Sequence, residues 1–301
     1  AFTIFICKKR WYNIRKHKKD MRVQMKKKLR NGLLIFLFLL LIPQMVWAGD
    51  MQVHFLDVGQ ADSILIQTAD AAMLVDAGTN EAGASVVSYI RSQGIETLDY
   101  VIGTHPHEDH IGGLDDVIRQ LNVKEVILPD KIHTTKTFED VLDAVEEKDL
   151  SVTTAHQGDD YSLGDAGFTI IAPCEGKDYK DELNNWSVGI RLVYGDTSFV
   201  MTGDAEKEAE ADMLASGENL QGDVWKAAHH GSSTSNTGQM LDAVQPTYAV
   251  ISCGKDNSYG HPHKETLEAF EKRGIQVFRT DEQGTIVATS DGKSLTFSAG
   301  R

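Results

Sequence analysis

Cysteine is scarce in this chain of 301 residues, which contains only three. Two of them, Cys174 and Cys253, lie beyond residue 48, and so few cysteines exclude a disulfide-rich scaffold. Cys253 ends the apolar run 248–253, which predicts a small buried side chain. A single bridge between the two cysteines is the alternative that the sequence leaves open.

Long hydrophobic runs are also lacking. The apolar run Leu33–Ile42 is shorter than the roughly 20 residues that a membrane-spanning helix needs. It follows the basic cluster Lys26–Arg30 and precedes Val46–Ala48, which offers small residues for cleavage. We therefore predict a signal peptide over residues 21–48, and an N-terminal anchor if the peptide is not cleaved.

The expected start is Met21 or Met25, so residues 1–20 are assigned to upstream translation or to a longer basic leader. Residues 1–48 are thus predicted to lie outside the fold. Residues 49–301 are long enough for one domain with a large core. The protein is expected to be secreted or extracytoplasmic, with no integral membrane partner, and monomeric.

Basic residues are few after residue 48, where 18 of the 30 Lys and Arg stand against 43 of the 44 Asp and Glu. The resulting formal charge of −25 repels nucleic acid phosphates unless a local basic groove compensates. The lysines in this part form no evident cluster, as shown by Lys124, Lys131, Lys136, Lys226 and Lys264. Tight binding of duplex DNA is therefore disfavoured.

Short apolar runs alternate with turn signals and helical patterns from residue 51 onward, and no low-complexity linker divides them. The predicted strands are Gln52–Leu56, Ser63–Thr68, Ala72–Asp76, Tyr100–Gly103, Glu125–Leu128, Thr169–Ala172, Val188–Val193, Ser198–Met201, Val224–Ala227, Tyr248–Ser252, Gln276–Arg279 and Thr285–Thr289. The predicted helices are Gly83–Gln93, Asp115–Leu121, Phe138–Lys148, Lys207–Ala215, Thr237–Val244 and Lys264–Lys272.

One pattern occurs twice. The segment 63–78 predicts a hairpin that ends in Asp76, and the segment 187–204 predicts a similar hairpin that leads to Asp204. A helix is predicted after each. Two related halves, each a sheet covered by helices, predict an α/β fold with four αββα layers and a site between the halves.

Four metal-capable side chains lie within residues 105–110, directly after a predicted strand. His105 and His107 are two residues apart in an extended segment and point the same way. Asp109 and His110 follow where the chain turns, so they can face a second point a few ångströms away. Imidazole and carboxylate ligands suit zinc, or manganese and iron in a more oxygen-rich site. Two neighbouring metal ions are typical of a hydrolytic centre.

These motifs together resemble the metallo-β-lactamase fold superfamily. The resemblance rests on the His-x-His-x-Asp-His pattern of residues 105–110, a preceding Asp at a strand end, and later Gly-Asp and His motifs. Segments 55–63, 202–204, 229–232 and 259–262 are more narrowly similar to the hydrolase module of ComEC-type competence proteins. A secreted phosphorylcholine esterase carries a similar module.

The resemblance implies a dinuclear site. His105 and His107 would bind one metal and Asp109 and His110 the other, with Asp204 bridging both; by itself Asp204 would instead suggest a helix N-cap. One of two adjacent histidines would bind metal and the other contact substrate, and the sequence does not decide between them. The implied metal ligands are His105, His107, Asp109, His110, Asp204, His229 and His230. The implied catalytic residues are Asp109, His230 and His261.

Supporting residues follow from the same resemblance. Asp76 would orient the histidine loop, and Asp57, Gln60 and Asp62 would form a supporting turn beside the site. Ala61 replaces the glycine of the family pattern. Asn185 lies where the wider superfamily often supplies a third histidine to the first metal. With no histidine there, that metal would have fewer protein ligands.

The sequence therefore predicts an exported hydrolase with two divalent ions, zinc in the first instance and manganese as the alternative. The predicted substrate is a phosphodiester, either small, part of the cell envelope, or DNA. The alternatives are a β-lactamase-type amide hydrolase and a non-catalytic binding module stabilised by metal.

Overall fold

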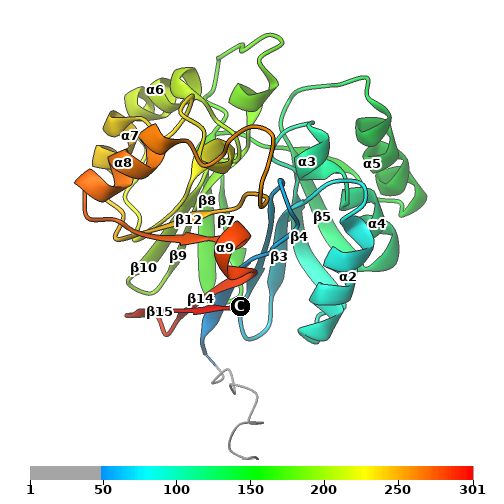
Figure 1. Ribbon diagram of the computed structural model, residues 1–301. Coiled ribbons are helices and arrows are strands. Elements are labelled where there is room, and N and C mark those ends of the chain that lie inside the picture. Colours follow the sequence, from blue (N-terminus) through cyan, green and yellow to red (C-terminus); the bar gives the residue numbers. More distant parts are fainter. Residues whose placement is uncertain (1–48, 301) are drawn as a thin grey trace, which may run out of the picture. The chain divides into compact units, whose positions relative to one another are not determined.

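Two β-sheets form the centre of the computed structural model, which describes residues 49–300 (Figure 1). The predicted signal peptide lies outside the described residues. Within residues 49–300, no helix has the length and apolarity needed to cross a membrane.

The first sheet has eight strands in the order β15-β14-β1-β2-β3-β4-β5-β6. Strands β3 to β6 run parallel, and β1 pairs antiparallel with both β2 and β14. The C-terminal hairpin thus returns to the sheet in which the domain begins. The strands are β1 Met51–Phe55, β2 Ser63–Gln67, β3 Ala72–Ala77, β4 Thr97–Ile102, β5 Asn122–Leu128, β6 Val152–Thr154, β14 Ile286–Ser290 and β15 Leu295–Ala299.

The second sheet has seven strands in the order β13-β12-β11-β10-β9-β8-β7. Its strands β10 to β13 are parallel, whereas β7 to β10 are joined antiparallel. The strands are β7 Asp160–Leu163, β8 Ala166–Ala172, β9 Gly189–Tyr194, β10 Thr197–Met201, β11 Val224–Lys226, β12 Tyr248–Ile251 and β13 Gln276–Arg279.

Helices cover the outer face of each sheet (Figure 1). On the first sheet these are α2 Gly83–Ser92, α3 Glu108–Ile111, α4 Leu114–Gln120 and α5 Lys136–Glu147. On the second sheet they are α6 Lys207–Ser216, α7 Gly238–Val244 and α8 Lys264–Lys272. The shorter elements are α9 Thr280–Gln283 and the 3-10 turns η1 Leu183–Trp186 and η2 Ala228–Gly231.

Three apolar clusters separate these layers. Alternate residues of a strand face opposite sides, so Ile64 and Ile66 of β2 pack between the sheets while Leu65 packs under the helices. In the second sheet, Phe199 of β10 faces the other sheet and Val200 packs under α6 to α8. Because both faces of the sheets are buried, the predicted four-layer αββα sandwich is confirmed.

Three strands were not predicted: β6, β7 and β15. All three lie at sheet edges and are partly exposed, and β6 and β7 lack the apolar pattern on which strand prediction depends. The alternation of Leu295, Phe297 and Ala299 in β15 was detectable and was overlooked. The parallel strands β3, β4, β10, β11 and β12 were predicted. Their carboxyl ends meet along one edge of the sandwich, where the loops that carry the histidines begin.

Candidate metal centre

Asp76 anchors the histidine loop. It is fully buried at the end of β3, with a positive φ of 57°. The backbone N–H and the hydroxyl of Thr104 each donate a hydrogen bond to its carboxylate at 2.8 Å, and His110 Nδ1 lies 2.7 Å from Oδ2. A carboxylate partner at Nδ1 leaves the Nε2 lone pair of His110 free to bind a metal.

Four side chains converge in front of this anchor: Asp109, His110, Asp204 and His230. Each offers a ligand atom within 4.8 Å of the others. His110 Nε2 lies 3.2 Å from Asp204 Oδ1, and His230 Nε2 lies 3.3 Å from Asp109 Oδ2. The sequence predicted all four as ligands, and the structure brings together two from each half.

This group fits a divalent cation. His110 Nε2 and Asp204 Oδ1 are buried, and although they are close, neither makes a geometrically acceptable hydrogen bond. Burial lowers the pKa of His110, but the carboxylates of Asp204 and Asp76 outweigh it and hold that pKa well above its usual value. A buried site that attracts a proton so strongly carries excess negative charge, and mixed nitrogen and oxygen donors suit zinc, manganese or iron.

His105 and His107 form a second group, which has only two candidate ligands. His105 Nε2 lies 2.9 Å from His107 Nδ1, as expected for two nitrogens that point to one site. On its other side, His105 Nδ1 lies 3.1 Å from Thr104 Oγ1 and 3.3 Å from Ser187 Oγ. Among the described residues, no third His, Cys or carboxylate joins this pair in a compact group.

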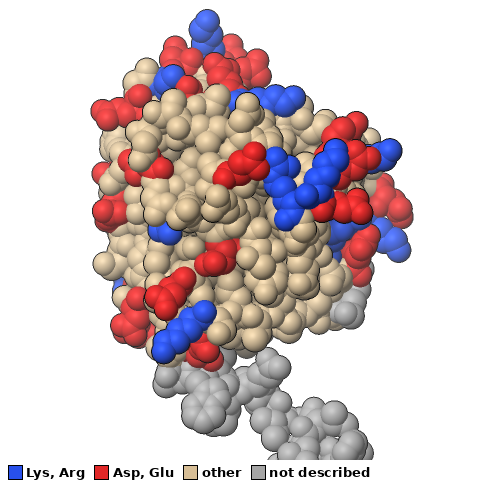
Figure 2. Space-filling model, turned by 90° about the vertical axis from the view of Figure 1, so that its left-hand side faces the viewer, with Lys and Arg blue, Asp and Glu red and all other residues tan. Residues whose placement is uncertain are grey.

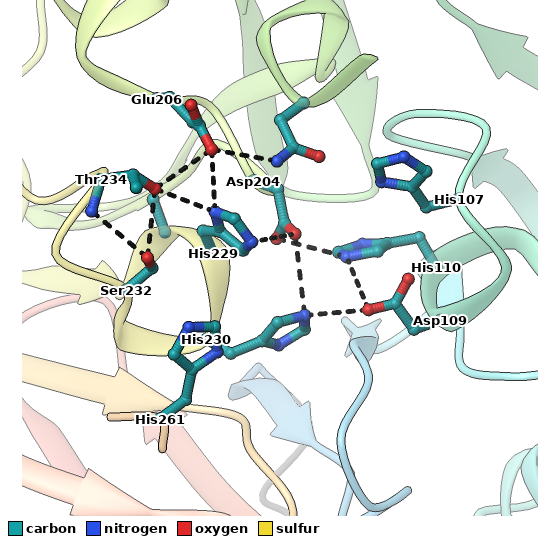
Figure 3. Close-up of polar contacts among 12 residues, drawn as sticks. His107, Asp109, His110, Asp204, Glu206, His229, His230, Ser232, Thr234 and His261 are labelled. Atoms are coloured by element: carbon teal, nitrogen blue, oxygen red, sulfur yellow. Dashed lines mark hydrogen bonds and ion pairs between the residues drawn. The ribbon is translucent and has the colours of Figure 1, made fainter. Parts of the chain in front are cut away.

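The two adjacent histidines have different surroundings (Figure 3). His230 is buried, and its Nδ1 lies 3.0 Å from the carbonyl of Ser252, which directs Nε2 towards Asp109. His229 lies at the rim, with Nδ1 3.3 Å from Glu206 Oε1 and Nε2 3.7 Å from Asp204 Oδ2. The structure thus groups His230 with the ligands and leaves His229 facing the cavity.

Glu206 holds His229 in place. Its Oε1 also accepts hydrogen bonds from Asn184 Nδ2 and Thr234 Oγ1, both at 3.1 Å (Figure 3). Hydrogen bonds from His229 and these neighbours hold the pKa of Glu206 below its usual value, although partial burial opposes the shift. Glu206 was not predicted as a site residue, because its only signal in the sequence is its position two residues after Asp204.

Asp204 is a candidate ligand and not a helix cap. Helix α6 begins at Lys207, and its N-cap residue is Glu206, so the alternative interpretation of Asp204 is wrong. The Asp204 N–H donates to Ser187 Oγ at 3.0 Å. The preceding Gly203 has a φ of 52°, and a Cβ there would lie 2.9 Å from Thr104, so the turn requires glycine.

Asn236 clamps the histidine turn. Both His229 and His230 have positive φ, and Asn236 (φ 60°) lies buried behind them. Its Oδ1 accepts from Trp225 Nε1 and from the Ala228 N–H, and its Nδ2 donates to the carbonyls of Ala228 and Ser232. The side chain therefore uses every hydrogen-bonding group it has.

The predicted supporting residues fall at different places. Gln60 accepts from the Gly254 N–H at 3.0 Å, and its Nε2 lies 3.3 Å from His261 Nδ1, so it presents His261 to the cavity. Asn185 Oδ1 accepts from the Glu206 N–H at 3.0 Å. Asp57 does not line the cavity, and its N–H donates to Thr285 Oγ1.

Asp62 forms a buried ion pair with Lys226 of β11, with 2.8 Å between the charged atoms. Lys226 is 1% exposed, so this lysine, which the sequence analysis counted among the scattered cations, is not a surface residue. Burial disfavours the charged Asp62, but Lys226 and His230 hold its pKa below its usual value.

A cavity of about 490 Å³ opens above these groups. The lining residues that the sequence analysis did not select are Thr79, Glu108, Asn184 and Tyr259. Tyr259 is 68% exposed and stacks on His261 with 5.6 Å between ring centres. It was overlooked as a site residue because one exposed aromatic carries no chemical signature in a sequence.

The model of the metallo-beta-lactamase superfamily matches residues 56–255. The chain belongs to this superfamily. It is 30% identical over 269 residues to ComE operon protein 3 of Bacillus subtilis and 30% identical over 248 residues to competence protein ComA of Neisseria gonorrhoeae. These matches cover 83% and 81% of the chain but only 34% and 33% of the relatives, so the chain spans about a third of their length.

Two solved structures share the fold. The metallo-beta-lactamase fold protein YhfI from Bacillus subtilis aligns over 83% of this chain and 100% of its own, with a TM-score of 0.53 and 13% identity. The diiron beta-hydroxylase CmlA from Streptomyces venezuelae aligns over 83% of this chain and 54% of its own, with a TM-score of 0.52 and 13% identity. The predicted superfamily and the relationship to ComEC-type competence proteins are confirmed.

Proposed function

We propose that the protein is an exported hydrolase that cleaves small phosphodiesters with two divalent metal ions, zinc in the first instance. The observation that carries the proposal is the group of Asp109, His110, Asp204 and His230, three of them buried, at the base of an open cavity. Two bound ions would lower the pKa of the attacking water and offset negative charge on the phosphate.

The chain's own residues divide the remaining work. Asp76 and Ser252 fix the rings of His110 and His230, so that their Nε2 atoms face Asp204 and Asp109 without rearrangement. Glu206 fixes His229, whose Nε2 is placed to contact a phosphate oxygen. Gln60 holds His261 beside His229, with 5.5 Å between the two ring centres, where it would contact the leaving group.

The charge of the cavity favours a singly charged phosphodiester. Its lining contains Glu108, Asp109 and Asp204 but no Lys or Arg among the described residues. Additional phosphate charges would meet carboxylates there, whereas one phosphate group needs no more positive charge than the metals supply. On the face shown in Figure 2, Lys and Arg lie among Asp and Glu and form no continuous basic band.

A substrate panel with added zinc or manganese tests the proposal. We expect hydrolysis of bis(p-nitrophenyl) phosphate to exceed that of p-nitrophenyl phosphate, duplex DNA, a phosphorylcholine ester and a cephalosporin. The rate should depend weakly on salt, because few lysines and arginines would contact the substrate. Efficient DNA cleavage that falls steeply with salt, or preferred cephalosporin hydrolysis, would contradict the proposed substrate class.

The control variants are His107→Ala and Asp109→Ala. We expect both to lose bound metal, measured by elemental analysis, and to lose hydrolysis while circular dichroism stays unchanged. Retention of both metals by the double variant would contradict the metal centre itself. Export is tested separately by recovering the protein from outside the cytoplasm and measuring its mass. The mass should correspond to a chain whose first residue is Gly49.

A further inference from the structure

The ion pair of Asp62 and Lys226 joins the two halves beneath the metal centre. Asp62 lies between β1 and β2 of the first sheet, and Lys226 lies on β11 of the second. Their side chains are 2% and 1% exposed, and Lys226 Nζ also donates to the carbonyl of Ala227 at 3.0 Å. A lysine is rarely buried this deeply, because removing two charges from water costs more than an ordinary contact returns.

Asp62 contacts one candidate ligand from each half. Its backbone N–H donates to the carbonyl of Asp109 at 3.0 Å, and its carbonyl accepts from the Gly78 N–H at 2.8 Å. Its carboxylate faces the other way: Oδ2 pairs with Lys226, and Oδ1 lies 3.4 Å from His230 Nδ1. Oδ1 is buried and has no hydrogen bond of acceptable geometry.

We propose that Lys226 is a positioning residue for the metal centre, which acts through Asp62 to set Asp109 of the first half against His230 of the second. This inference rests on the proposed metal centre. The lysine fixes one carboxylate oxygen of Asp62, and the other oxygen then faces the His230 ring while the Asp62 backbone holds Asp109. Lys226 is too buried to contact substrate, so its effect reaches the reaction only through these ligands.

Three variants separate positioning from simple structural support: Lys226→Met, Asp62→Asn and the double variant. In the double variant both buried charges are gone, so folding is expected to survive. The control is Lys124→Met, which removes a lysine paired at 2.6 Å with Asp99 at an exposed site away from the cavity. Each purified full-length protein is titrated with zinc against a chelator and, separately, loaded with cobalt to record its absorption spectrum.

Lys226→Met and Asp62→Asn should each weaken the binding of one of the two zinc ions by about 10- to 100-fold, the usual effect of losing a residue that orients a ligand. The cobalt spectrum should change with it. The double variant should regain the melting temperature of the wild type but keep the weakened binding. Lys124→Met should bind zinc like the wild type.

Two results would overturn the proposal. One is wild-type zinc affinity and cobalt spectrum in Lys226→Met; the other is recovery of zinc affinity in the double variant, which would show that the pair only stabilises the fold. If Lys226→Met does not fold, the double variant still decides. Zinc affinity is measured without substrate, so an error in the proposed substrate leaves this test unaffected.

Discussion

The two halves of the molecule supply their candidate ligands in different ways. The first half places four of them on one short loop, residues 105–110, which a single carboxylate anchors. In the second half, Asp204 and His230 stand on separate loops whose backbone takes positive φ at or beside the ligand. The first half of the site is therefore encoded locally, whereas the second depends on contacts between segments distant in sequence.

The largest effect is expected for Asp204→Asn, which tests whether Asp204 binds metal together with the candidate ligands of both halves. Asp204→Asn should lower turnover by about 1,000-fold, because a neutral amide replaces the shared carboxylate opposite His110 and His230. Steady-state kinetics measures the loss, and Asp212→Asn, a carboxylate of α6 that pairs with Lys177, is the control. Near-wild-type turnover would show that the carboxylate of Asp204 binds no metal.

The same difference explains what the sequence could predict. The parallel strands and the histidine loop were predictable because apolar runs and the spacing of His105, His107, Asp109 and His110 are local features. The assignment of Asp204 needed the family resemblance. The roles of His229 and His230 depend on Glu206 and Ser252, which approach from other segments, so no local pattern could separate the two histidines.

Lys226 illustrates the limit most clearly. In the sequence it is one cation among several, and only the fold shows that it is buried against Asp62. The edge strands β6 and β7 were missed for the opposite reason, since they are partly exposed and have little apolar pattern to detect. In both cases the deciding information is tertiary burial, which a sequence window does not contain.

The second largest effect is expected at Asn236, whose side chain holds the histidine turn of the second half. Asn236→Ala should lower the free energy of unfolding by about 3 to 4 kcal/mol, because it leaves Trp225 Nε1 and the Ala228 backbone buried without partners. Denaturant unfolding measures this, and zinc binding should weaken as the histidine turn loosens. The control is the exposed Asn122→Ala in the first half, with no measurable change expected. Equal stability of the two variants would show that the histidine turn keeps its conformation without the Asn236 side chain.

His54 is a buried histidine that lies apart from the candidate ligands, and it can be compared with His229 and His230. His54 of β1 is 2% exposed, its Nδ1 lies 2.9 Å from the Tyr89 hydroxyl, and burial lowers its pKa to about 4. The unfolded chain takes up this proton near pH 6.5, so stability is complete above that pH and falls as the pH drops towards 4. The loss should approach about 3 kcal/mol.

Urea unfolding at several pH values, compared with His54→Gln, isolates this contribution. The difference in unfolding free energy between wild type and variant should be constant above pH 6.5 and should shift against the wild type below it. If the plots of unfolding free energy against pH stayed parallel for the two proteins down to pH 4, His54 would accept its proton in the folded state as readily as in the unfolded chain.

The smallest expected effect is at the rim of the cavity, where the lining residues of the two halves are not candidate metal ligands. Tyr259 stacks on His261 and exposes its other face at the mouth, so it can contact a substrate without touching the metal ligands. Tyr259→Ala should raise KM for an aryl phosphodiester roughly five-fold and leave kcat unchanged, because a contact equally strong in the ground and transition states affects binding alone. Tyr259→Phe, which keeps the ring, should behave like the wild type. A fall in kcat in Tyr259→Ala would instead show that the stack positions His261, and the rim would then belong to the catalytic site.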